Sequence, residues 1–235
     1  MSNATIAFFS IGKGESENSD AFLHLGFPDG RWMLAIADGV GSAKFGGQAA
    51  RLAVEVCRES GSALSIREIF AVVDDRIAEA AGDSHGQWST TLSLCVFHNG
   101  QAHVGHVGDA RIYHIRGAGL LTRTHDQTEV ERLIEEGVLT RERAQRYPRK
   151  HVLLSSMNGG GDYQLEESTF GLQPGDRVLL ASDGFYKKVL KREIVGWSIA
   201  CEEVDEFVDT LKGMLMTRGV VDDATVLCAQ IPVRA

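Results

Sequence analysis

The stretch RWMLAIADGVGSAKFGG, Arg31 to Gly47, joins a short apolar run to a glycine-rich turn. The apolar run, Trp32 to Ala37, has the length and composition of a buried strand. It ends in Asp38-Gly39, and a segment typical of a helix packed on a sheet begins at Gly47. The stretch therefore predicts a strand that carries a carboxylate to the edge of the hydrophobic core.

Two further apolar runs end in the same way, and an acidic pair precedes the last one. VGHVGDA contains Asp109, VLLASDG contains Asp183, and Asp222-Asp223 stands just before ATVLCA. A single Asp-Gly is ordinary turn chemistry, but this recurrence favours a cluster of converging acids. Like charges in proximity oppose ionisation, so such a cluster needs cations. Hard divalent ions such as Mg²⁺ and Mn²⁺ prefer carboxylate, carbonyl and water oxygens, and glycine after Asp38 allows a carbonyl to approach closely.

Composition and charge restrict the class of protein. The chain has 235 residues, little proline and no low-complexity linker, so we expect one domain over residues 1–235. We expect no membrane association, because no apolar run approaches the ~20 residues that cross a bilayer and the N-terminus lacks a signal-peptide pattern. The net charge of −8 argues against nucleic-acid binding. Four cysteines lie far apart without CxxC spacing, which favours reduced thiols and a cytoplasmic protein: Cys57, Cys95, Cys201 and Cys228.

Hydrophobic periodicity and turn signals predict hairpin-linked strands with helices in pairs. We expect strands over Ala4–Ile11, Ala21–Phe27, Trp32–Asp38, Thr90–Phe97, Ala102–Val107, Arg111–Ile115, Leu165–Phe170, Arg177–Ala181 and Ala224–Ile231. We expect helices over Gly47–Cys57, after a capping box at Ser65–Glu68, from Thr128 to Gly137, and over Lys191–Met216. The order is not the regular alternation of a doubly wound fold. It predicts an α+β protein of two mostly antiparallel sheets packed face to face, with helices on the outer faces.

Seven short motifs in order resemble the metal-dependent Ser/Thr protein phosphatases of type 2C, particularly the compact bacterial members. The resemblance covers nearly the whole chain and implies a four-layer αββα sandwich, which agrees with the pattern of elements. The motifs are Asn18-Ser19-Asp20-Ala21, Asp38-Gly39-Val40-Gly41, Ser89-Thr90-Thr91-Leu92, Gly108-Asp109-Ala110-Arg111, Asp126-Gln127-Thr128, Ser182-Asp183-Gly184-Phe185 and Asp222-Asp223-Ala224-Thr225.

The resemblance gives each acidic position a role. Asp38 bridges two Mn²⁺ or Mg²⁺ ions, Asp183 and Asp222 complete the first site, and the carbonyl of Gly39 helps hold the second. Asp20 acts mainly through bound water, and Asp109 with Asp183 resembles a third metal site. The implied reaction is attack of a metal-activated water on phosphoserine or phosphothreonine, which makes Asp38, Asp183 and Asp222 the catalytic residues and requires no protein nucleophile.

Three positions depart from the family pattern. Glu15 stands where an arginine usually grips phosphate, so we expect other basic residues to do this, with Lys13, Lys44 and Arg149 as candidates. Ser19 replaces a metal-binding Glu of some relatives, which predicts a second site richer in water. Val40 replaces a proposed general-acid histidine, and either a metal-bound water, His125 or His151 takes that role.

The segment SSMNGGGDY, Ser155 to Tyr163, is polar and glycine-rich. It predicts a flexible turn at Asn158–Gly161, for which a role in gating substrate is an alternative to a plain connection.

Three functions are compatible with these residues. The leading prediction is a phosphoprotein phosphatase that opposes a Ser/Thr kinase and acts as a monomer. Glu15 and Ser19 favour the alternative of a catalytically weak or inactive regulatory protein on the same fold. The third reading is a small-molecule phosphatase. Retention of the acidic motifs favours activity, because a scaffold has little need of converging carboxylates.

Overall fold

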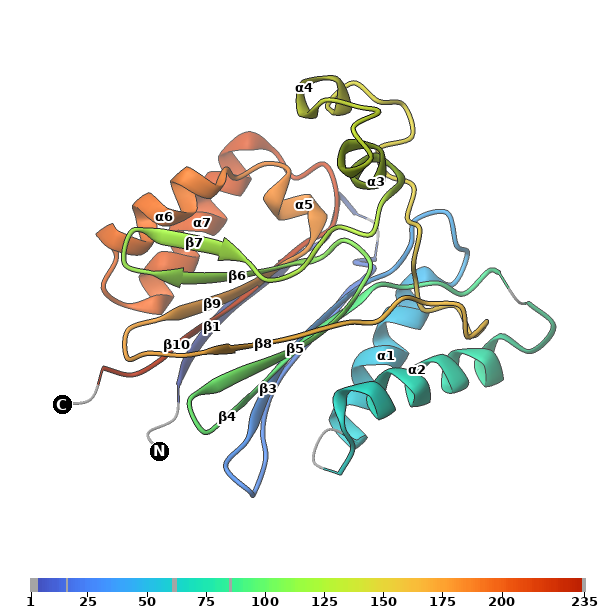
Figure 1. Ribbon diagram of the computed structural model, residues 1–235, viewed down its shortest axis with the longest axis horizontal. Coiled ribbons are helices and arrows are strands. Elements are labelled where there is room, and N and C mark those ends of the chain that lie inside the picture. Colours follow the sequence, from blue (N-terminus) through green and yellow to red (C-terminus); the bar gives the residue numbers. More distant parts are fainter. Residues whose placement is uncertain (1–3, 16, 61–62, 85, 234–235) are drawn as a thin grey trace.

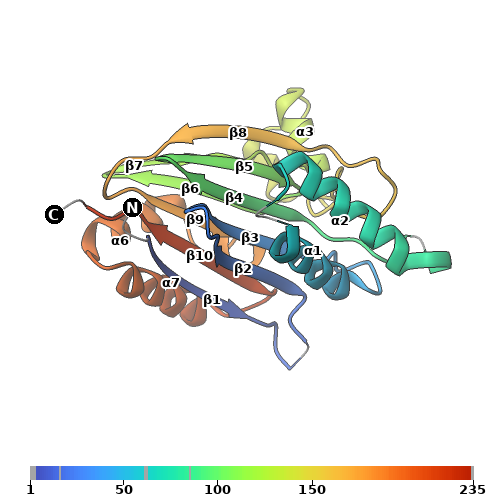
Figure 2. The same ribbon diagram turned by 90° about the horizontal axis from the view of Figure 1, so that it is seen from below.

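Two five-stranded antiparallel sheets pack face to face in the computed structural model, and helices cover both outer faces (Figures 1 and 2). The structure describes residues 4–15, 17–60, 63–84 and 86–233. One sheet has the order β1 (Thr5–Ile11), β10 (Ala224–Gln230), β9 (Arg177–Ala181), β6 (Arg111–Arg116) and β7 (Gly119–Thr122). The other has the order β2 (Asp20–Gly26), β3 (Trp32–Asp38), β4 (Leu92–His98), β5 (Gln101–Val107) and β8 (Glu166–Gly171). The predicted α+β sandwich is confirmed.

The helices divide between the two faces and one end of the sandwich. Those on the β2–β8 sheet are α1 (Gly46–Ser60) and α2 (Ile66–Ala81), the latter followed by a short 3₁₀ turn at Gly82–Ser84. Those on the other sheet are α5 (Asp183–Tyr186), α6 (Lys191–Ala200) and α7 (Val204–Arg218). The remaining two, α3 (Glu129–Glu135) and α4 (Arg141–Ala144), project beyond the sheets (Figure 1), and we call residues 129–150 the arm.

Strand β3 shows how the opening stretch of sequence determines the layers. Successive side chains of a strand point to opposite faces. Met33, Ala35 and Ala37 therefore pack in the core beneath α1 and α2, and Leu34 and Ile36 pack in the core between the sheets. All five are fully buried, which explains why the run is continuously apolar rather than alternating.

The predicted helix over Lys191–Met216 is wrong in one respect, because the chain forms two helices that are separated at Cys201–Glu203. The buried guanidinium of Arg177 in β9 accounts for the break. It donates to the carbonyls of Ser198, Cys201 and Glu202 at 2.7–2.8 Å. A side chain of the sheet thus satisfies carbonyl groups at the end of α6 that a continuing helix would otherwise have paired. Its Nε also donates to the Gln230 side chain at 2.9 Å.

The smaller elements β7, α4 and α5 were not predicted, because each covers only four residues and gives little periodic signal. The capping box of α2 is confirmed, with Ser65 N donating to Glu68 Oε2 at 2.8 Å. Strand β4 begins at Leu92 rather than Thr90, since Thr90 forms isolated bridges to Gly39 and Met157 instead.

None of the helices in the described ranges combines the length and apolar content needed to cross a membrane.

One carboxylate holds the glycine-rich turn at Asn158–Gly161, which was predicted to be flexible. Asp74 of α2, which is 6% exposed, accepts from the backbone N–H groups of Asn158, Gly159 and Gly161 at 3.3, 2.8 and 2.7 Å. These bonds tie the turn to the outer helix layer, and the turn does not line the cleft described below. A gating role for it therefore has no support.

We expect Arg177→Met to lower the free energy of unfolding by about 3 kcal/mol, because the substitution leaves the buried carbonyl of Cys201 and two partly buried carbonyls without this donor. Arg177→Lys should recover only part of the loss, since an ammonium lacks the planar fork of a guanidinium. Urea unfolding followed by circular dichroism measures this. The control Arg192→Met, at an exposed position of α6, should stay within about 0.5 kcal/mol. Equal urea midpoints for Arg177→Met and the native chain would contradict the assignment.

Candidate active site

The acidic residues that end the apolar runs come together in one cleft of about 550 Å³. Asp38 is the last residue of β3, Asp183 is the first residue of α5, and Asp109 and Asp222 lie in the connections next to β5 and β10. All four line the cleft, although they come from both sheets. The convergence expected from the recurring pattern is therefore present in the fold, and it occurs at one end of the sandwich.

Burial and mutual repulsion make this cluster costly to ionise. Burial, reinforced by the charges of Asp20 and Asp183, raises the pKa of Asp38 well above its ordinary value. Burial also raises the pKa of Asp109 to about 7, with a further contribution from Asp183. Carboxyl groups with such pKa values favour either protons or bound cations, and oxygen donors suit hard divalent ions.

Asp20 lies beneath the cleft and joins the two sheets. It faces Asp38 in the register of β2 and β3. Its Oδ2 accepts from Ser182 Oγ at 2.8 Å, and Ser182 Oγ in turn accepts from Thr225 N at 2.9 Å. Burial raises the pKa of Asp20 to about 7. Its other oxygen, Oδ1, is buried without a hydrogen-bond partner. A cation or its bound water would satisfy this unpartnered oxygen, which lies on a residue opposite Asp38.

The glycines that follow Asp38 and Asp183 are required by close backbone contacts. A Cβ on Gly39 would lie 2.4 Å from the carbonyl carbon of Gly46, at the start of α1. A Cβ on Gly184 would lie 2.1 Å from the carbonyl oxygen of Asp223. Each contact brings a neighbouring segment against the residues next to Asp38 or Asp183. The two Asp-Gly pairs therefore also bring the walls of the cleft together.

The backbone around the cluster is fixed by neutral donors. Thr91 N and Thr90 Oγ1 donate to the carbonyl of Asp38 at 2.9 and 3.0 Å, and Asp38 N donates to Thr91 Oγ1 at 3.0 Å. The Asp223 carboxylate accepts from the backbone N–H groups of Lys13 and Ser19, each at 2.7 Å. Asp223 thus has a structural role that the sequence pattern did not reveal: it holds the segment that carries Lys13 against the cleft.

The structure separates the residues predicted to bind phosphate. Lys13 lines the cleft, whereas Lys44 and Arg149 do not. The Lys44 ammonium lies 5.0 Å from the centre of the Phe45 ring. Arg149 belongs to the arm, where its Nε and Nη2 donate to the Glu129 carboxylate at 2.8–3.1 Å. The arginine is therefore engaged within the arm, and its predicted contact with phosphate has no support in the structure.

The two histidines considered as general acids also separate. His151 lines the cleft, whereas His125 is bound through Nδ1 to Glu166 Oε1 at 2.8 Å and is not part of the lining. Lys187, which sequence reasoning missed, contacts one of these histidines and one residue of the acidic cluster. Its Nζ donates to Asp183 Oδ2 and, at 3.1 Å, to His151 Nδ1. The spacing of four residues from Asp183 on α5 was the available signal.

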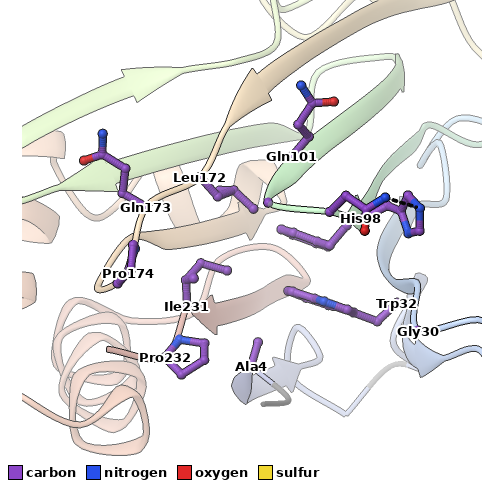
Figure 3. Close-up of a pocket in the computed structure, with 13 residues that line it drawn as sticks. Ala4, Gly30, Trp32, His98, Gln101, Leu172, Gln173, Pro174, Ile231 and Pro232 are labelled. Carbon is purple, nitrogen blue, oxygen red and sulfur yellow. Dashed lines mark hydrogen bonds between the residues drawn. The ribbon is translucent and has the colours of Figure 1, made fainter. Parts of the chain in front are cut away.

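A second cavity, of about 240 Å³, lies at the other end of β3 (Figure 3). Trp32 stacks on Phe97 with ring centroids 3.5 Å apart, and the lining combines apolar side chains such as Leu172 with uncharged polar ones such as Gln101. Within the described ranges, no Lys, Arg, Asp or Glu lines this cavity. Its chemistry does not suit a phosphate or a metal ion, so the acidic cleft is the candidate active site.

The acidic cleft has the donor chemistry of a metal centre, but two of its carboxylates already have hydrogen-bond partners within the protein. In the ranges that the structure describes, no three Asp, Glu, His or Cys groups lie close enough together, as they stand, to hold one ion. Asp183 is bound to Lys187, and Asp223 is bound to backbone donors. Metal binding at Asp183 therefore requires that the carboxylate exchange its present partner. The orphaned oxygen of Asp20 and the high pKa values of Asp38 and Asp109 are the observations that fit a divalent cation.

Comparison with known proteins gives a consistent result. A family model described as protein phosphatase 2C matches residues 11–221. Protein phosphatase PhpP of Streptococcus pneumoniae is 29% identical over 227 residues, covering 92% of each chain. The structure of the Mycobacterium tuberculosis serine/threonine phosphatase PstP/Ppp superposes with a TM-score of 0.84 at 25% identity, over 98% of this chain and 99% of that one. The catalytic domain of PstP in complex with two manganese ions gives a TM-score of 0.81 at 25% identity, over the same shares.

We expect Asp38→Asn to raise the free energy of unfolding of the metal-free protein by about 1–3 kcal/mol at pH 8, because it removes one charge from a repelling cluster. Urea unfolding in EDTA measures the effect. Asp75→Asn, at an exposed position of α2, is the matched control and should change little. A less stable Asp38→Asn protein would show that the cluster is not under electrostatic strain.

The metal-free protein should become more stable as the pH falls from about 8 to about 5. Asp20 and Asp109 have pKa values of about 7 in the folded chain, against 3.8 for an exposed aspartate. Between these values the folded chain binds protons that the unfolded chain does not, so lower pH favours folding, by about 1.4 kcal/mol per unit for each proton. Thermal melts in EDTA across this range test the prediction. A melting temperature that falls steadily below pH 7 would refute it.

Proposed function

Because the chain belongs to the protein phosphatase 2C family, we propose that it removes phosphate from phosphoserine and phosphothreonine in proteins with the help of Mn²⁺ or Mg²⁺. The observation that carries the proposal is the convergence of Asp38, Asp109, Asp183 and Asp222 in one cleft. The name of the S. pneumoniae relative, a protein phosphatase, supports the substrate class. The PstP catalytic domain bound to two manganese ions supports the metal requirement.

The ligand set that we propose uses the carboxylates in distinct roles. Asp38 would contact both ions, Asp183 and Asp222 would complete the first site, and the carbonyl of Gly39 would contribute to the second. Asp20 would act mainly through bound water, which agrees with its position beneath the cleft and its unpartnered Oδ1. Asp109, with Asp183, would hold a third ion. When bound, the ions supply Lewis-acid activation of water and neutralise the charge of the phosphate.

The chain itself supplies rigidity and a pathway for hydrogen bonds. The bonds of Thr90 and Thr91 hold Asp38 by its backbone and leave its carboxylate oxygens available. Lys187 is a donor only, so His151 Nδ1 must accept and the ring proton must sit on Nε2. Burial and the nearby charges of Lys187 and Lys150 lower the pKa of His151. The imidazole therefore offers its Nε2–H as a hydrogen-bond donor at the cleft.

We further propose that the chain acts as a single-domain, cytoplasmic monomer that opposes a Ser/Thr kinase. The buried state of all four cysteines supports reduced thiols and hence the cytoplasm. The phosphoprotein substrates imply a kinase that makes them.

Activity assays with p-nitrophenyl phosphate and a phosphothreonine peptide should show turnover that requires Mn²⁺ or Mg²⁺ and disappears in EDTA. Asp38→Asn and Asp183→Asn should each lower kcat by about 100-fold or more, because each removes charge that stabilises the transition state. Asp75→Asn serves as the control. Absence of metal-dependent turnover of either substrate would refute the enzymatic function. Turnover of p-nitrophenyl phosphate alone would point to small-molecule substrates.

A further inference from the structure

Lys187 occupies an unusual position for a lysine in a predicted metal centre. Its ammonium forms an ion pair with Asp183, and its side chain is only 37% exposed. The side chain is thus a cation in direct contact with a carboxylate of the acidic cluster. It does not line the acidic cleft itself but lines, with Asp109, a neighbouring cavity of about 440 Å³ beside the arm. The lysine thus stands between the acidic cleft and the arm.

The ion pair between Lys187 and Asp183 is incompatible with metal binding at the same oxygen. Asp183 Oδ2 accepts from the ammonium, and a divalent cation that binds this oxygen must displace it. The displaced ammonium stays within reach of the site, because Lys187 directly follows α5 and lies one helical turn from Asp183. Its second partner, His151 Nδ1 at 3.1 Å, is neutral and cannot balance its charge.

We propose that Lys187 exchanges Asp183 for the phosphate of the substrate when the metal ions bind, and so becomes a phosphate-positioning cation beside the cleft. The proposal rests on the proposed function. In the metal-free protein the ammonium offsets part of the carboxylate repulsion, and in the loaded protein it faces the incoming dianion. Lys187 therefore opposes the metal ions and assists the substrate. A lysine with a merely structural role would support both kinds of binding or neither.

The test compares Lys187→Met with Lys187→Arg and with Lys188→Met, the neighbouring lysine, which lines neither the acidic cleft nor the cavity beside the arm. Titration calorimetry of the metal-free proteins with Mn²⁺ should show binding about 3- to 10-fold tighter for Lys187→Met, because a competing internal cation is lost. Inhibition of p-nitrophenyl phosphate hydrolysis by inorganic phosphate at saturating Mn²⁺ should become about 10-fold weaker. Lys187→Arg should retain most of the phosphate inhibition, and Lys188→Met should match the native protein in both measurements.

Opposite shifts in the two affinities support the exchange. An unchanged Mn²⁺ affinity or an unchanged phosphate inhibition in Lys187→Met overturns it while leaving the phosphatase function intact. Weaker binding of both ligands, with a lowered melting temperature, also overturns it and assigns Lys187 a structural role. Failure of the native protein to bind Mn²⁺ at all would overturn the proposed function first, and the exchange with it.

Discussion

Repulsion among carboxylates at one end of the sandwich is the constraint around which the structure is organised. Asp20, Asp38 and Asp109 all have raised pKa values, chiefly because they are buried. The fold holds them with neutral partners: threonine hydroxyls and N–H groups at Asp38 and a serine hydroxyl at Asp20. Neutral donors orient an acidic residue without neutralising it, so the negative charge remains for a ligand. Folding free energy is given up where binding free energy is needed, as is common at functional sites.

The two-sheet architecture makes this crowding possible. No single sheet edge in the described structure carries all the acids, because Asp38 and Asp20 belong to one sheet and Asp183 and Asp222 adjoin strands of the other. The bonds from Asp20 through Ser182 to Thr225 therefore determine how the halves of the cleft are placed relative to one another. Close backbone contacts at Gly39 and Gly184 complete the fit. The geometry of the cleft thus depends on how the sheets pack, more than on any one loop.

Most of the fold could be predicted from local patterns, and most of the misses have non-local causes. The buried runs, the hairpin-linked strands β4 and β5 and the capping box of α2 each follow from a few adjacent residues. The break between α6 and α7 depends on Arg177, which lies in a different strand. In the site, the recurring Asp-Gly pattern indicated the cluster. It could not show that Arg149 forms an ion pair with Glu129, twenty residues away. Nor could it show that Asp223 binds the backbone of Lys13 and Ser19. Lys187 is the exception, since its spacing from Asp183 was visible in the sequence.

The arm is stabilised largely by its own residues. Its ion pairs join Arg149 to Glu129, Arg141 to Glu131 and Arg132 to Glu136, and a short ladder between 127–129 and 152–154 joins its two ends to each other. Substitutions, insertions or deletions within it can therefore accumulate without disturbing the acidic cluster.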